Sequence, residues 1–247
     1  MLRRPTGLVL AAGAGRRLRP HTDELPKTLV PLGSGRTVLG SILRNFAEVG
    51  IEEAVIVVGC LAEAIEQRVP ELEAGTGLAI TLVHNDHAED RNNAYSLWCA
   101  RDLLQRTDVL LANGDTLHPA SVQQALLDAP TGRITLALDR HKQLGAEEMK
   151  VRLDASSHLQ HISKGLPHDV EGEYIGVAHL PASRGAVLVD ALERTWAADE
   201  QRYYEDAFQL LADEGEPIAA VEIGAVDWIE IDDLVDLARA EVLACRS

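Results

Sequence analysis

The chain has 247 residues, with 23 lysines and arginines against 39 aspartates and glutamates, and a formal net charge of −16. This acidic excess argues against a surface that binds nucleic acid or an anionic membrane, and no apolar run approaches the roughly 20 residues that span a bilayer. The length suits a single α/β domain, and three scattered cysteines without metal-ligand spacing favour a reduced, cytoplasmic protein.

The first half of the chain alternates predicted strands with predicted helices. Continuous apolar runs predict buried strands at residues 7–12, 54–58, 78–83 and 109–112. Apolar residues at helical spacing predict helices at residues 37–49, 61–68 and 94–104. This alternation is typical of a mostly parallel sheet that is covered by helices on both faces.

After residue 130 the predicted strands become shorter and are separated by turns. They lie at residues 133–138, 149–153, 158–162 and 174–178, and they indicate a small antiparallel extension. The remaining elements are helices at 184–197 and 204–213, a strand at 218–223 and a last helix at 234–244. We therefore expect an α/β fold with a Rossmann-like, mostly parallel sheet, helices on both faces and an antiparallel extension, in one domain over residues 1–247.

The most informative segment follows the first predicted strand. It combines glycines with a group of cations, namely Gly13, Gly15, Arg16, Arg17, Arg19 and Lys27. Glycines let backbone N–H groups approach an anion closely and cations neutralise polyphosphate charge, so the segment predicts a loop that holds a nucleoside triphosphate. Leu18 stands where a Rossmann fingerprint has its third glycine, and no Walker-type Gly-Lys-Ser/Thr follows. The alternative is a tight strand-to-helix turn with incidental arginines.

The whole segment resembles the signature of nucleotidyltransferases that join a nucleoside triphosphate to a phosphorylated small molecule, through Gly13-x-Gly15-x-Arg17, Pro20-x-Thr22, Pro26-Lys27 and Pro31. The sugar-1-phosphate nucleotidylyltransferases and the CTP-dependent choline-phosphate enzymes share this signature. The resemblance implies that the nucleotide is bound by Leu10, Ala11, Ala12, Gly13, Ala14 and Gly15. It also implies two catalytic residues, with Arg17 neutralising the departing pyrophosphate and Lys27 contacting the phosphate under attack.

Two carboxylates far apart in the sequence are candidate metal ligands. Asp115 follows the strand at residues 109–112, at the edge where open α/β sheets bind ligands. Asp232 lies in a run, residues 228–232, that resembles the family's second metal-binding motif, and together the two can hold Mg²⁺. The alternatives are a turn former at Asp115 and a helix N-cap at Asp232. Glu230 ranks lower, because an extended strand would point it to the opposite face from Asp232.

A third motif narrows the family. Residues 91–98 resemble the Asn-Asn-x-Tyr-Ser segment of bacterial CTP:phosphocholine cytidylyltransferases and of their relatives that act on phosphonates. Asn92 and Asn93 offer donors and acceptors for a pyrimidine edge or a ribose hydroxyl, and Ser96 and Asn113 are further nucleotide-binding candidates. Asn93 alone is also explained as the N-cap of the following helix.

The acceptor-binding residues are expected in the second half of the chain, where further segments resemble the same branch. The candidates are Lys150, Lys164, Glu173, Tyr203, Tyr204, Glu205, Asp206 and Trp228. The aromatic and acidic members, together with Trp196, suit a cage for a quaternary ammonium, although aromatic residues also cluster simply to pack a core. Choline-specific members of the family carry Tyr-Trp-Asp where this chain has Tyr-Glu-Asp at residues 204–206. Lys150 suits a phosphate or phosphonate, or else forms a solvated strand-edge pair with Glu148.

The resemblance implies a nucleotide-binding half at about residues 1–130 and an acceptor-binding half at about residues 131–247. The expected function is Mg²⁺-dependent transfer of CMP from CTP to a small phosphocholine-like or 2-aminoethylphosphonate-like acceptor, with release of pyrophosphate. The alternatives are a sugar-1-phosphate nucleotidylyltransferase that uses another nucleotide, and a non-catalytic nucleotide-binding regulatory module. The expected partners are these two substrates, with neither nucleic acid nor membrane, and the expected state is a monomer or a homodimer.

Overall fold

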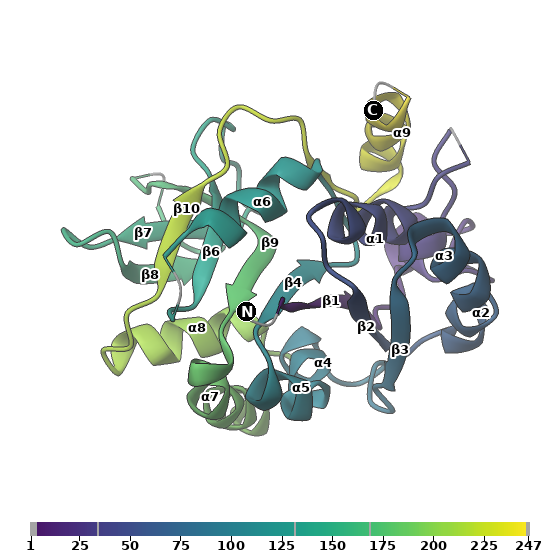
Figure 1. The fold of residues 1–247 in the computed structure, drawn as a ribbon. Helices are drawn as coiled ribbons and strands as arrows, with labels where there is room; N and C mark the ends of the chain where they lie inside the picture. The colour runs from purple at the N-terminus through teal and green to yellow at the C-terminus, as the bar shows by residue number, and fades with distance from the viewer. Residues whose placement is uncertain (1–3, 34, 131, 168, 246–247) are drawn as a thin grey trace.

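A central β-sheet carries helices on both faces (Figure 1). The computed structural model describes residues 4–33, 35–130, 132–167 and 169–245. Across the sheet the strands follow the order β10 (Ala219–Glu222), β6 (Thr135–Asp139), β9 (Gly172–Leu180), β4 (Val109–Asn113), β1 (Thr6–Ala11), β2 (Glu53–Val58) and β3 (Ala79–His84). β9 is antiparallel to both of its neighbours, whereas the other neighbouring pairs are parallel. The predicted α/β fold with a mostly parallel sheet is confirmed.

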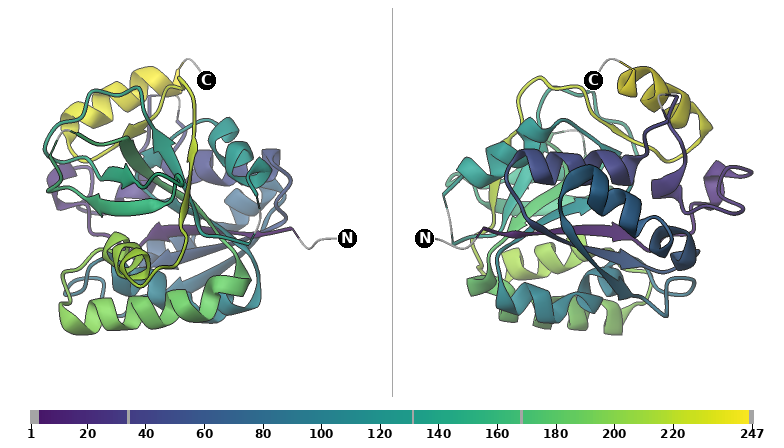
Figure 2. Two further views of the ribbon diagram at one scale, coloured as in Figure 1. Left: turned by 90° about the vertical axis from the view of Figure 1, so that its left-hand side faces the viewer. Right: turned by 45° about the vertical axis from the view of Figure 1, so that its right-hand side comes forward.

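Two layers of helices enclose the sheet, as both views in Figure 2 show. One layer contains α1 (Val38–Glu48), α2 (Ala62–Glu66), α3 (Val69–Thr76), α6 (Ala120–Asp128) and α9 (Leu234–Ala244). The other contains α4 (Asn93–Cys99), α5 (Arg101–Arg106), α7 (Gly185–Ala198) and α8 (Tyr204–Asp213). Along β1, Val9 packs into the core on one face and Leu8 into the core on the other, because successive side chains of a strand point to opposite faces. No helix in the described part of the chain is both long and apolar enough to cross a bilayer.

The strand expected at residues 174–178 lies in the middle of the main sheet and not in the antiparallel extension. It forms part of β9, whose nine residues are all buried between β6 and β4. The extension consists of β7 (Lys150–Leu153) and β8 (Leu159–Ser163), and β7 pairs with the start of β9. A continuously buried strand needs cover on both faces, which only a central position in the sheet provides.

Two helices are present that the apolar pattern does not predict, and one predicted helix is divided. α3 has no buried residue, so its sequence carries no apolar period. α6 begins directly after Pro119 and buries Val122 and Leu126 one turn apart. The helix expected at residues 94–104 is interrupted at Ala100, between α4 and α5. These differences leave the strands that carry the site unchanged.

A small second sheet joins distant parts of the chain beside the end of β4. β5 (Thr116–Leu117) pairs antiparallel with β11 (Ile229–Glu230), and the Ile231 N–H donates to the Asp115 carbonyl at 3.0 Å. α9 follows at once, capped by Asp233. The pairing therefore brings the two candidate metal ligands, which are more than a hundred residues apart in the sequence, to the same edge of the main sheet.

Candidate active site

A pocket of about 430 Å³ opens at the carboxyl ends of β1 and β4. Loops at these strand ends form the ligand site of open α/β sheets. The pocket brings together most of the residues that the sequence analysis selects, namely Leu10, Ala12, Gly13, Gly15, Arg17, Lys27, Asn92, Asn93, Ser96, Asn113, Asp115, Lys164, Tyr203, Glu205 and Asp232. One concave surface therefore collects groups from both halves of the chain.

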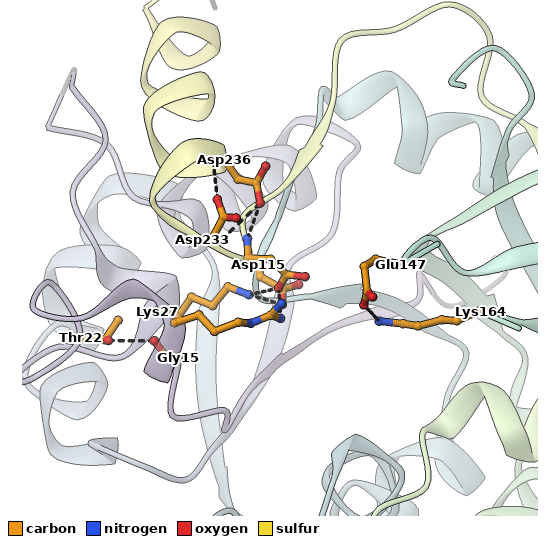
Figure 3. Close-up of polar contacts among 10 residues, drawn as sticks. Gly15, Thr22, Lys27, Asp115, Glu147, Lys164, Asp233 and Asp236 are labelled. Atoms are coloured by element: carbon orange, nitrogen blue, oxygen red, sulfur yellow. Dashed lines mark hydrogen bonds and ion pairs between the residues drawn. The ribbon is translucent and has the colours of Figure 1, made fainter. Parts of the chain in front are cut away.

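The loop after β1 is shaped by the left-handed conformation of Gly15. Its φ is +59°, and its carbonyl accepts a hydrogen bond from the Thr22 hydroxyl at 2.8 Å (Figure 3). The short helical turns η1 (Arg16–Leu18) and η2 (Lys27–Leu29) follow and bring Arg17 and Lys27 to the pocket. A Cβ atom on Gly15 would lie 2.8 Å from the Lys27 Cβ, so the glycine and the lysine are closely packed.

Lys27 bridges the two aspartates. Its Nζ donates to Asp115 Oδ2 at 2.9 Å (Figure 3). The same Nζ donates to Asp232 Oδ1 at 2.9 Å, and Arg17 Nη2 lies 2.9 Å from that Asp232 oxygen. Burial by itself would lower the pKa of Lys27, but the two carboxylates outweigh burial and raise that pKa above its ordinary value. Burial likewise opposes ionisation of Asp232, yet Lys27 and Arg17 lower its pKa. The cations and carboxylates therefore hold each other in their charged forms.

Asp115, Glu230 and Asp232 form a cluster of carboxylates that is able to hold a divalent cation. One oxygen from each lies within 4.8 Å of the others. Asp115 Oδ1 is buried and has no hydrogen-bond partner within the part of the chain that is described. Mg²⁺ prefers oxygen ligands of this kind, so the donor set fits it. Glu230 is exposed at the pocket, and partial desolvation together with the neighbouring carboxylates of Asp115 and Asp232 raises its pKa above the ordinary value.

The expectation that Glu230 points away from Asp232 is wrong. β11 contains only Ile229 and Glu230, and the chain leaves the strand before Asp232. The alternation of side chains therefore does not extend from one acidic residue to the other. Glu230 is a third candidate ligand, and a two-residue strand is too short for its orientation to be read from sequence.

Asn92 and Asn93 line the pocket and also hold the loop before α8. Asn92 is the N-cap of α4, because its Oδ1 accepts from the Asn93 N–H at 2.8 Å, so the cap expected at Asn93 lies one residue earlier. Its Nδ2 donates to the Gln201 carbonyl at 3.0 Å. Asn93 Oδ1 accepts from the Tyr204 N–H at 2.9 Å. The asparagine pair thus fixes the wall of the pocket that contains Tyr203 and Glu205.

Tyr204 lies beneath the pocket and does not line it. The side chain is completely buried, and its hydroxyl donates to Asn113 Oδ1 at 3.0 Å and lies 3.1 Å from the Tyr174 hydroxyl. On the other side of Asn113, a Cβ atom at Gly176 would lie 2.4 Å from its Nδ2. Tyr204 is therefore a positioning residue for Asn113, which does line the pocket.

Two charged acceptor candidates are buried outside the pocket. Lys150 Nζ donates to the Lys164 carbonyl at 2.7 Å, so the buried lysine supports the backbone of the turn that follows β8. This excludes the solvated pair with Glu148 that is the alternative for Lys150. Glu173 is paired with Lys142 at 3.0 Å, and burial raises its pKa to about 7. Neither residue borders the pocket at the ends of β1 and β4.

Two further acceptor candidates have structural partners. The Trp228 Nε1–H donates to Asp139 Oδ2 at 2.6 Å. Asp206 accepts from the Tyr203 N–H at 2.9 Å, which completes the capping box of α8. Two nucleotide-binding candidates, Ala11 at the end of β1 and Ala14 in the loop that follows, also lie off the pocket lining.

The pocket wall also contains residues that are not among the candidates, including Arg91, Glu147 and Met149. Glu147 lies 3.9 Å from Lys164, and this pair stands across the pocket from Lys27 and Asp115 (Figure 3). Glu147 and Met149 belong to the segment around Lys150 that resembles the phosphocholine and phosphonate branch. That resemblance was the available signal, but it does not say which of the side chains face the substrate.

We expect Gly15→Ala to lower kcat/KM for nucleotidyl transfer by about tenfold or more, because the added methyl displaces Lys27. Gly77→Ala is the matched control, since Gly77 has φ +75° and open space around its Cβ position. Both variants carry the same left-handed strain of roughly 1–2 kcal/mol, so both should melt slightly lower. Equal kcat/KM in the two variants would show that the contact with Lys27 is unimportant.

The fold and the pocket have the arrangement expected of an NTP transferase domain: a loop rich in glycine and cations faces carboxylates at the edge of a parallel sheet. The chain belongs to the family of MobA-like NTP transferase domains, which matches residues 7–202. The family resemblance seen in the sequence is therefore confirmed.

Individual relatives extend this assignment. The chain is 31% identical to CMP-5'-(3-aminopropyl)phosphonate synthase of Streptomyces rubellomurinus, over 95% of this chain and 38% of that protein. It is 35% identical to the choline-phosphate cytidylyltransferase of Streptococcus pneumoniae over 106 residues, a stretch that covers 43% of each of the two chains. The matches span less than half of either curated relative. The structure of the inositol-1-phosphate CTP transferase from T. maritima shares the fold, with a TM-score of 0.83 and 23% identity over 98% of this chain and 95% of that one.

Proposed function

We propose that the protein transfers CMP from CTP to a small phosphorylated or phosphonate acceptor and releases pyrophosphate. The proposal rests on one observation. Arg17, Lys27 and the three carboxylates line a single pocket, together with the asparagine pair at residues 92 and 93. The names of the Streptomyces and Streptococcus relatives support a cytidine nucleotide and an acceptor of this class.

The reaction is a direct displacement at phosphorus. An acceptor oxygen forms a bond to the α-phosphorus of CTP, the bond from that phosphorus to the bridging β-phosphate oxygen breaks, and its electron pair leaves with pyrophosphate. The acceptor oxygen is already anionic at neutral pH, so neither a general base nor a covalent enzyme intermediate is required.

The residues of the pocket act through position and charge. Lys27 is proposed to neutralise the phosphates at the reacting centre and Arg17 the leaving pyrophosphate, both as fixed charges that need no reorganisation. Asp115, Glu230 and Asp232 are proposed to hold Mg²⁺, which when bound neutralises charge on the triphosphate. Asn92, Asn93 and Asn113 offer the amide groups that suit the base and ribose.

Pyrophosphate release tests the proposal when CTP, UTP, dTTP and GTP are each paired with phosphocholine, 2-aminoethylphosphonate, inositol phosphate and glucose 1-phosphate. We expect turnover with CTP to exceed turnover with the other nucleotides by about tenfold or more, and EDTA to abolish it. A preference for glucose 1-phosphate with another nucleotide would instead identify a sugar-1-phosphate nucleotidylyltransferase. Nucleotide binding without release from any pair would leave only a nucleotide-binding module.

A further inference from the structure

Glu205, at the start of α8, combines deep burial with an unused oxygen at the wall of the pocket. Its side chain is 5% exposed, and Oε2 has no hydrogen-bond partner in the part of the chain that is described. Two cations line the same side of the pocket: Lys164, whose charge favours ionisation of Glu205, lies 3.9 Å from Glu147, and Arg202 pairs with Asp206 at 3.1 Å. Leaving one oxygen of a buried carboxylate without a partner is costly, and burial raises the pKa of Glu205 to about 7 even though its own backbone N–H and Tyr204 act to lower it.

Glu205 stands where a side chamber of about 270 Å³ meets the nucleotide pocket. Met149, Lys164, Tyr203 and Glu205 line both cavities, so the two spaces adjoin along these side chains. A substrate whose phosphorus lies near the nucleotide therefore has room to extend its other end into the chamber. The side chamber is large enough for a short chain that carries one charged group.

The side chamber lacks the surroundings that a quaternary ammonium needs. Such a group cannot donate hydrogen bonds and is held over aromatic faces. Of the described residues that line the chamber, Tyr203 is the only aromatic one, and Lys164 Nζ already lies 5.4 Å from its ring centroid. Of the other aromatic members of the expected cage, Tyr204 and Trp228 have hydrogen-bond partners outside the chamber, and Trp196 packs against Tyr95 and Trp98. A primary ammonium, by contrast, has three N–H donors that can reach an unused carboxylate oxygen.

We propose that Glu205 binds a primary ammonium group of the acceptor, and that the acceptor is a short aminoalkyl phosphonate or phosphate and not a choline compound. This inference rests on the proposed function, which leaves the acceptor open. Glu205 supplies binding and orientation: it holds the distal end of the acceptor while the phosphorus end faces the nucleotide.

Calorimetric titration of the full chain at pH 8 tests the inference, with a non-hydrolysable CTP analogue present. The probes are 2-aminoethylphosphonate and 3-aminopropylphosphonate, their amine-free counterparts ethylphosphonate and propylphosphonate, and phosphocholine. We expect Glu205→Gln to weaken binding of the better amine-bearing probe by about tenfold or more, and to leave the amine-free probes and the CTP analogue within about twofold. The matched control is Glu173→Gln, which neutralises an equally buried glutamate outside the pocket and should leave every affinity unchanged.

The thermal stability of Glu205→Gln shows whether the variant is folded. The pKa of Glu205 is raised from 4.5 to about 7 in the folded protein, so its ionisation destabilises the fold as the pH rises through that window. Glu205→Gln should therefore melt no lower than the wild type at pH 8, and weaker binding cannot then be assigned to unfolding.

Three results would overturn the inference: equal affinity of wild type and Glu205→Gln for the amine-bearing probes, phosphocholine binding as tight as theirs, or no binding of them at all. Two further results would separate a failure of the proposed function from a failure of the inference about Glu205. Binding of an aminoalkyl phosphonate without pyrophosphate release from CTP would reject the transferase and keep the site. Equally efficient transfer to propylphosphonate would reject the site and keep the transferase.

Discussion

Replacing Asp232 with asparagine is expected to lower kcat/KM for pyrophosphate release by on the order of a thousandfold. The substitution removes a candidate metal ligand and the negative oxygen that both Lys27 and Arg17 contact at 2.9 Å. Loss of one preorganised charged group costs roughly 10²–10³ in rate, and weaker metal binding adds to that loss. Kinetics at a series of Mg²⁺ concentrations, together with direct titration of Mn²⁺, separates the two contributions.

The neighbouring residue provides the control. Asp233→Asn makes the same chemical change one position later, where the carboxylate caps α9 by accepting from the Val235 N–H at 2.8 Å and the Asp236 N–H at 3.0 Å. Asparagine caps helices about as well as aspartate, so this variant should keep kcat/KM within about twofold of the wild type. If Asp232→Asn retains more than about a tenth of wild-type kcat/KM, a loss below 1.4 kcal/mol, Asp232 has no place in the reaction.

The fold could be predicted where burial and sequence pattern coincide. β1, β2 and β4 are short apolar runs that are buried on both faces, and their position and parallel pairing follow from that pattern. α3 buries no residue, so it leaves no apolar period to detect. The place of β9 shows another limit. An apolar run shows that a strand is buried, but its neighbours are chosen by contacts between distant parts of the chain.

The residues of the candidate site also differ in how far their roles can be predicted from the sequence. Gly15, Arg17 and Lys27 lie in one short loop, so their chemistry and their proximity are both visible in the sequence. Lys150 and Tyr204 have the residue types of a substrate site, but their hydrogen-bond partners come from other elements of the fold. Whether a polar side chain faces a pocket or a backbone carbonyl is decided by packing, and local sequence carries little of that information.

Lys27→Met is expected to lower kcat by about a hundredfold, equivalent to roughly 2.7 kcal/mol of barrier, while binding of a divalent cation is kept or strengthened. The reason is the double role proposed for its Nζ, which neutralises the reacting phosphates and also lies 2.9 Å from the carboxylates of both Asp115 and Asp232. Without the lysine the three carboxylates repel one another more strongly, so the cation-free protein should melt lower and gain more from added Mg²⁺ than the wild type does. Thermal melts with and without Mg²⁺, combined with single-turnover kinetics, measure both effects.

Lys142→Met is the matched control for this variant. Lys142 also lies between two carboxylates, Glu173 at 3.0 Å and Glu148 at 3.8 Å, but none of the three borders the nucleotide pocket. Its loss should leave kcat and the Mg²⁺ response unchanged, because the charge removed is not directed at the phosphates. A Lys27→Met enzyme that loses less than about tenfold in kcat would remove Lys27 from the reacting phosphates. A lysine that only neutralises the carboxylates competes with the cation, so it cannot be required for cation binding. If the Lys27→Met enzyme no longer binds divalent cations, the role of Lys27 is instead to hold Asp115 and Asp232 in position.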